Sequence, residues 1–213
     1  MCIASMYNAG ACRSITVLVL ALLCIRVSAN TSYRETDARK VLHPPHDYWL
    51  LRRSHNANTT FATTKTCVQL EYIDMNETAD LAMLDARKSG NEEWSPVMYI
   101  ASAIAGNENK YDILQFSPFE DDSNAEIVTF NYQVLHVAQN SCYIVARLEG
   151  SSDTLPEHDN KRVHNCELWV KKEKYTPSES SSVTADNRKK CIRQFRELCS
   201  VGNRLYSKRA CES

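Results

Sequence analysis

Residues 165–172 read NCELWVKK, in which acidic and aromatic letters alternate with aliphatic ones, the two-residue period of a β-strand. Cys166 stands at the entrance of this strand, and Glu167 shares a face with Trp169. If that face points into a core, Glu167 needs a ligand, a Lys or Arg side chain or a hydroxyl as partner, because a buried unpaired carboxylate is costly. If the face points outward, water solvates the carboxylate.

Seven further segments show strand patterns, and polar turns or turns with Pro, Gly or Asn separate most of them. This spacing is typical of an all-β barrel or sandwich. The segments are 47–54, 66–73, 79–86, 97–105, 111–116, 126–138 and 142–149. In the sixth segment one parity is expected to face inward, and it comprises Val128, Phe130, Tyr132, Val134 and His136.

Two helices are predicted beside the strands. Residues 33–42 form a short helix that ends at the His-Pro-Pro run of 43–45. After a polar loop at 176–187, residues 186–200 place apolar side chains at three- and four-residue spacing, and Gly202 ends this helix. Such a helix must bury its stripe against the strands. The predicted fold is therefore all-β: an eight-stranded antiparallel lipocalin barrel with a short N-terminal helix and a C-terminal α-helix packed on the wall.

The first 29 residues are interpreted as a secretory signal peptide. Residues 15–25 form an uncharged apolar run that is too short to span a bilayer, and 27–29 supply the small residues of a cleavage site. The mature chain, 30–213, then has the length of a single lipocalin domain. The chain is predicted to be secreted without membrane insertion; an uncleaved signal anchor is the alternative.

Cysteine use agrees with secretion. The chain has nine cysteines, of which those at 2, 12 and 24 leave with the signal peptide. The remaining even number indicates three disulfides in an oxidising compartment, for which the sequence alone permits fifteen pairings. Sequons at Asn30, Asn58 and Asn76 are predicted glycosylation sites.

The charge is unevenly distributed along the chain. Residues 30–160 contain 10 Lys or Arg and 20 Asp or Glu, a balance of −10, whereas residues 161–213 contain 13 and 6, a balance of +7. Two solvated faces that partly neutralise each other explain this pattern. The alternative is that 171–174, 188–190 and the C-terminal basic residues form a patch for an acidic surface. Nucleic acid is not an expected partner of a secreted chain.

Five short motifs carry a family resemblance: TKTCVQLEY (64–72), NSCYIV (140–145), CELWV (166–170), CIRQF (191–195) and the terminal ACES (210–213). Their order and cysteine placement resemble the secreted salivary lipocalins of ticks, the histamine-binding protein family, from about Tyr48 to Ser213. The Gly-x-Trp start of other lipocalins is replaced here by the sequence Asp-Tyr-Trp at 47–49. The resemblance implies the disulfides Cys67–Cys211 and Cys142–Cys191, which leaves Cys166 with Cys199.

The resemblance also implies a ligand class. The family default is a small host mediator of the biogenic amine type, such as histamine or serotonin, held by inward carboxylates and aromatic rings. Glu167 matches the acid of the Glu-Leu-Trp motif. However, Tyr143 stands after the strand cysteine where the amine signature has Asp, and the stretch from that cysteine to Glu167 is longer than the signature allows. Asp112 and Asp85 are the candidate substitutes for the missing acids.

The inferred lining is therefore aromatic and mostly neutral, and ordinary barrel core is the alternative reading for each ring. This lining gives weight to a second function, a carrier of a hydrophobic ligand such as an eicosanoid, fatty acid or sterol. A third is an immunomodulator that binds a host protein through its surface. The predicted ligand-binding residues are Glu167, Trp169, Tyr143, Phe130, Tyr132, Phe116 and Asp112, while His136 is expected to be a core histidine.

Catalytic and cofactor motifs are not found in the sequence. It contains no Gly-x-Ser-x-Gly, no His-Glu-x-x-His and no phosphate loop. The prediction is a protein that is not an enzyme and carries no cofactor or metal. Its expected partners are a small molecule, either a biogenic amine or a lipid mediator, and, in the third reading, a host protein.

Overall fold

A computed structural model describes ten stretches of the chain: 34–54, 67–76, 81–88, 97–106, 109–119, 129–138, 141–148, 162–172, 181–200 and 202–211. For residues 75–76, 81–88, 97, 181–185, 208 and 210 the description covers the backbone alone. The signal-peptide prediction for residues 1–29 and the sequons at Asn30 and Asn58 lie outside these stretches. Asn76 is the last residue of a strand, and its glycosylation stays a prediction.

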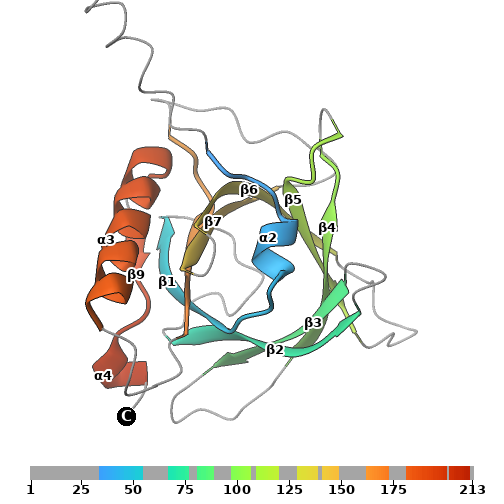
Figure 1. Ribbon diagram of the computed structural model, residues 1–213, viewed down its shortest axis with the longest axis horizontal. Helices are drawn as coiled ribbons and strands as arrows, with labels where there is room; N and C mark the ends of the chain where they lie inside the picture. Colours follow the sequence, from blue (N-terminus) through green and yellow to red (C-terminus); the bar gives the residue numbers. More distant parts are fainter. Residues whose placement is uncertain are drawn as a thin grey trace, which may run out of the picture. The chain divides into compact units, whose positions relative to one another are not determined.

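Eight antiparallel strands form a closed ring in which each strand pairs with its neighbours in sequence, and the first strand pairs with both the second and the eighth. The prediction of an eight-stranded antiparallel barrel is confirmed (Figure 1). The strands are β1 (Tyr48–Ser54), β2 (Val68–Asn76), β3 (Leu81–Lys88), β4 (Val97–Ile104), β5 (Ile113–Pro118), β6 (Phe130–Ala138), β7 (Cys142–Arg147) and β8 (Cys166–Lys171).

A ninth strand, β9 (Gly202–Arg204), pairs with the end of β1 where β2 no longer does. β2 is paired with β1 only at Tyr48 and Trp49, so the later residues of β1 have an edge available for β9. The two backbones approach closely, because a Cβ atom on Gly202 would lie 1.6 Å from the carbonyl oxygen of Arg53. Sequence analysis did not predict β9, since three residues are too few to show a period.

The apolar side chains form two cores, one on each face of the barrel wall. The inner core holds alternate residues of the strands together with the N-terminal segment, for example Leu50, Leu114 and Val145. The outer core lies between the wall and α3 (Ser181–Leu198), with Ile144 and Phe195 among its members. Figure 1 shows α3 outside the ring, and this helix packs on β6, β7 and β8. The predicted packing of the C-terminal helix on the barrel wall is thus confirmed.

Three disulfides connect the C-terminal region to the barrel, and they are the three pairs that the resemblance implies. Cys142–Cys191 and Cys166–Cys199 join α3 or its end to the starts of β7 and β8. Cys67–Cys211 joins α4 (Lys208–Cys211) to the residue before β2. The cysteine at the entrance of the NCELWVKK strand therefore ties that strand to the C-terminal helix.

The N-terminal helix is shorter than predicted. Only α2 (Arg39–Leu42) is helical, whereas the sequence predicted a helix over 33–42. Two contacts explain the difference: the Asp37 carboxylate accepts a hydrogen bond from the backbone N–H of Arg39, and the Glu35 carbonyl accepts one from the N–H of Val137 on β6. These bonds hold residues 34–37 in an extended segment along the barrel wall, because they compete with helical hydrogen bonds.

The predicted start of the C-terminal helix and the predicted polar loop before it need correction. The C-terminal helix begins at Ser181, five residues before the predicted start at 186, so part of the predicted polar loop at 176–187 is helical. Serine and threonine suggested a loop there, but the last proline lies at 177, and nothing after it prevents a helix.

No helix in the described stretches is long and apolar enough to cross a bilayer.

The predicted inward face of β6 holds only in its first half. Tyr132 and Val134 belong to the inner core, but the register shifts between Val134 and His136, and Val137 takes the next inward position. His136 therefore does not continue the inward row, because one extra residue at a bulge reverses the parity of all that follows. Val128 lies outside the described stretches.

Candidate ligand-binding site

Aromatic rings line the interior of the barrel in two groups. In the first group Tyr143 stacks on Trp169 with ring centroids 6.1 Å apart, and Tyr48 meets Tyr143 edge-on at 4.8 Å. Tyr143 and Trp169 are directly opposite on β7 and β8, so the strand register creates the stack. The second group comes from β4, β5 and β6, and its rings meet edge to face: Tyr99, Phe116, Phe130 and Tyr132.

Glu167 also faces the interior, with 1% of the residue exposed. Its Oε2 atom accepts a hydrogen bond of 3.0 Å from Trp169 Nε1, and its Oε1 atom forms an ion pair of 3.2 Å with Arg53 Nε. The side chains of Arg53 and Glu167 are 7% and 2% exposed, so water screens this pair little. The carboxylate of NCELWVKK therefore points inward and meets an arginine, one of the three partners that its burial required.

Burial is the largest influence on the pKa values of Glu167, Tyr143 and Tyr48 in the interior. It raises the pKa of the Glu167 carboxyl above its ordinary value, while the positive charge of Arg53 and the hydrogen bond from Trp169 act in the opposite direction. Burial also raises the pKa of the hydroxyl groups of Tyr143 and Tyr48, so both stay neutral. A charged group of a ligand in this interior would consequently meet Glu167 and the arginines rather than a tyrosinate.

A β-bulge in β1 turns Arg53 inward. Leu50 faces Trp169 on β8, Arg52 faces Leu168 and Arg53 faces Glu167, so Leu51 is an extra residue in the ladder. Leu50 belongs to the inner core and Leu51 to the outer core. With strict alternation Arg53 would point outward, as Leu51 does, and Glu167 would lack this partner.

Glu167 lies toward the end of the barrel opposite to α2. Tyr48, at the start of β1, donates a hydrogen bond to the carbonyl of Val41 in α2. Arg53 comes five residues later, about 17 Å along an extended strand. Arg147, the last residue of β7, places its guanidinium 5.1 Å from the ring centroid of Phe130, the first residue of β6. We call this region, with Arg53, Arg147, Glu167 and Phe130, the far end of the barrel.

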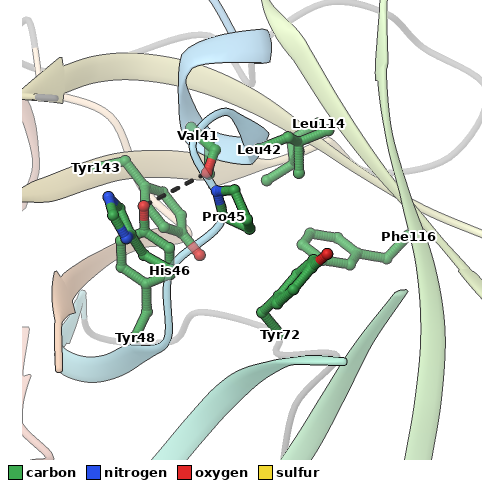
Figure 2. A pocket seen from close by; sticks show the side chains of 9 residues that line it. All are labelled: Val41, Leu42, Pro45, His46, Tyr48, Tyr72, Leu114, Phe116 and Tyr143. Carbon is green, nitrogen blue, oxygen red and sulfur yellow. Dashed lines mark hydrogen bonds between the residues drawn. The ribbon is translucent and has the colours of Figure 1, made fainter. Parts of the chain in front are cut away.

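The end of the barrel near α2 is closed by the N-terminal segment. Figure 1 shows α2 in the middle of the ring of strands, and Figure 2 shows Pro45 between Tyr143 on one side and Tyr72 on the other. The hollow that remains has a volume of about 10 Å³, the space of about one water molecule. A larger ligand therefore requires side chains to move. The lining comprises Val41, Leu42, Pro45, His46, Tyr48, Tyr72, Leu114, Phe116 and Tyr143.

The structure brings six of the seven predicted ligand-binding residues to the barrel interior: Glu167, Trp169, Tyr143, Phe130, Tyr132 and Phe116. Asp112 precedes β5, and its Oδ1 atom lies close to Gly106, in the turn after β4, where an added Cβ atom would be 2.4 Å away. The side chain of Asp85, the other candidate acid, lies outside the described part of the chain. Whether any of these residues binds a ligand stays a prediction.

Arg53 is the main interior residue that sequence analysis missed. Its neighbourhood, LLRRS (50–54), contained a signal, because two leucines followed by two arginines break the period of a strand and indicate a bulge. Tyr48 and Tyr99 were missed as lining residues although both lie in predicted strands, because the inward parity of those strands was not assigned. The described residues contain no group of three or more His, Cys, Asp or Glu side chains placed to hold a metal ion.

Comparisons with known proteins place this barrel in a family. Residues 27–213 match the family model described as tick histamine binding protein. No curated protein matches the chain. Among solved structures, lobster apocrustacyanin A1 is similar, with a TM-score of 0.44 and 9% sequence identity over 89% of this chain and 86% of that one.

Proposed function

The chain belongs to the tick histamine-binding protein family, and from that premise we propose that it is a secreted carrier that sequesters a small host mediator inside its barrel. Capture of such a mediator would weaken the host's inflammatory or immune defence. The first candidate ligand is a biogenic amine such as histamine or serotonin. The observation that carries this choice is Glu167, a buried carboxylate that accepts a hydrogen bond from the indole N–H of Trp169 inside the barrel.

The amine proposal assigns a role to Arg53 as well. An ammonium that leaves water needs a negative charge and π faces as replacements, and Glu167 with Trp169 and Tyr143 supplies both. In the ligand-free protein the guanidinium of Arg53 neutralises Glu167. The ligand's ammonium takes the place of this guanidinium, and the side chain of Arg53, one residue from the end of β1, moves away from Glu167.

Calorimetric titration with histamine and with serotonin tests the amine proposal. Glu167→Gln should weaken amine binding about 30-fold or more, because one partner of a buried charge pair is lost. Arg53→Gln should strengthen it and couple it to the release of one proton, because the ammonium then displaces the proton that Glu167 takes up in this variant instead of an ion pair. Glu71→Gln is the matched control, since Glu71 pairs with Lys172 away from the interior cluster. If amines produce no heat, or if Glu167→Gln binds them as the wild type does, the amine proposal is wrong.

A second candidate ligand is a hydrophobic carboxylate of the eicosanoid or fatty-acid class. The observation that favours it is the charge of the far end, where Arg53 and Arg147 face the single carboxylate of Glu167. Arg53→Gln separates the two candidates, because it should weaken the binding of a carboxylate lipid and strengthen that of an amine. Native mass spectrometry of the secreted protein, before and after denaturation, identifies any lipid that co-purifies.

Secretion has its own test. Expression of the full chain in animal cells should release a protein whose first residue is Asn30, as N-terminal sequencing would show. Removal of N-linked glycans should then lower its mass, with Asn58 and Asn76 as further acceptors. A protein that stays in the membrane fraction with residues 1–29 attached would instead support the signal-anchor alternative.

A further inference from the structure

Three arginines lie on the outer wall of the barrel, one each on β1, β9 and α3, the helix that lies outside the ring in Figure 1. Arg52 of β1 and Arg204 of β9 are direct partners across the two antiparallel strands. Arg196, in the last turn of α3, is close enough for its charge to act on Arg52. We call these three residues the arginine seam. The seam continues toward Arg188, whose guanidinium lies 5.4 Å from the ring centroid of Tyr206.

The seam is electrostatically unfavourable for the protein alone. Like charges directly opposite on neighbouring strands repel one another. In the described part of the chain, no carboxylate forms an ion pair with any of the three seam arginines. The nearby acids of α3 are engaged elsewhere on the helix, since Asp186 pairs with Lys189 and Glu197 with Arg193.

The lack of compensation for positive charge is clearest at Arg52. Its Nε atom is buried and has no hydrogen-bond partner among the described residues. Partial burial lowers the pKa of its guanidinium, and the charges of Arg196 and Arg204 lower it further. Arg204 uses its own Nε to donate a hydrogen bond to the carbonyl of Tyr206, and this bond does not engage its two Nη atoms. An oxyanion would satisfy the buried donor and reduce the repulsion between the neighbouring positive charges.

We propose that the arginine seam binds the sulfate groups of a sulfated polysaccharide, independently of the ligand inside the barrel. Three guanidinium groups supplied by a strand, a neighbouring strand and a helix suit a tetrahedral anion with several acceptor oxygens. A carboxylate offers two coplanar oxygens and suits a single guanidinium fork better. Arg188, farther along α3, gives a chain with repeated sulfate groups a second contact. Such a contact would hold a secreted carrier at a sulfated extracellular surface.

Binding of a heparin-derived dodecasaccharide, measured by surface plasmon resonance at several salt concentrations, tests the proposal. We expect about fivefold weaker binding for each of Arg52→Gln and Arg204→Gln, with a smaller dependence on salt. The control variant is Lys189→Gln/Lys190→Gln, which removes two positive charges from exposed positions of the same helix and should change binding less. Because Arg52→Gln removes a repulsive contact, it should not lower the unfolding temperature, and this is measured alongside.

Three outcomes would overturn the proposal. The first is equal loss of binding in the lysine control, which would show that net charge alone attracts the polysaccharide. The second is equal binding of a desulfated dodecasaccharide. The third is equally tight and equally Arg52-dependent binding of a polyglutamate peptide, which would assign the seam to an acidic protein segment instead.

Discussion

Replacement of Arg53 by glutamine would leave Glu167 inside the barrel without its cation, and the cost of this change should depend on pH. The buried carboxyl avoids an uncompensated charge by taking up a proton. From an ordinary pKa of 4.5, keeping it protonated costs about 3.4 kcal/mol at pH 7 but only about 0.8 kcal/mol at pH 5. The loss in free energy of unfolding should therefore be larger at pH 7 than at pH 5, and the protonation cost of about 3.4 kcal/mol is an upper bound on this difference, because the pKa of Glu167 is already raised in the wild type.

The reverse replacement, Glu167→Gln, should behave differently. It leaves the guanidinium of Arg53 buried, and a guanidinium cannot lose its proton in this range. The expected loss is about 3–5 kcal/mol at pH 7 and no smaller at pH 5, because breaking one side of a buried pair leaves the other charge uncompensated. The double variant Arg53→Gln/Glu167→Gln carries no buried charge and should recover much of the stability that either single variant loses.

Guanidinium chloride unfolding with the disulfides intact, at pH 5 and at pH 7, measures these differences through linear extrapolation. Glu71→Gln is again the control, because its pair with Lys172 is partly exposed and should contribute less than about 1 kcal/mol. If Arg53→Gln costs less than 1 kcal/mol at pH 7, or costs the same at both pH values, Glu167 is not held in a dry interior. The ligand chemistry proposed for it would then lose its basis.

Two further predictions concern stability. Because burial raises the pKa of Glu167, the folded protein holds this proton more tightly than the unfolded chain does. The stabilising contribution is present below pH 4.5 and is lost as pH rises through the folded-state pKa; Glu167→Gln should remove this decline when unfolding is measured from pH 4 to 7. For the disulfides, replacing Cys67 and Cys211 by alanine should cost about 5 kcal/mol and replacing Cys166 and Cys199 about 3.7 kcal/mol, since the closed loops span 144 and 33 residues. Thermal unfolding in the reverse order would contradict the chain-entropy argument.

The fold was predictable because it rests on local patterns that repeat. Eight apolar segments with period two, each ended by a turn, leave few all-β arrangements, and one amphipathic helix must cover the wall. Elements that are too short to show a repeating hydrophobic pattern were not predictable. β9 has three residues and exists because β1 has an edge that β2 does not cover, and α4 has four residues. Their positions depend on contacts between distant parts of the chain.

The candidate site was predicted in part, for a related reason. Tyr143, Trp169 and Glu167 were identified because the family motifs mark them and because their strands alternate without interruption. Arg53 was not identified, since its direction depends on one extra residue in the ladder of β1. The same effect misplaced His136, after the register shift in β6. Parity counted along a sequence is reliable only as far as the first bulge.

The bulge in β1 has a consequence for both faces of the barrel. Because Leu51 is the extra residue, Arg52 and Arg53 point to opposite sides of the barrel wall. Each of the two side chains lies close to another charged residue. Arg53 meets Glu167 inside, and Arg52 meets Arg204 outside. Without the bulge the two arginines would exchange faces, and the interior would still hold a cation but at another register against β8. One irregularity in one strand thus sets the position of the arginine in the barrel interior and of the arginine in the outer seam, so the two proposed binding sites are linked through the backbone of β1.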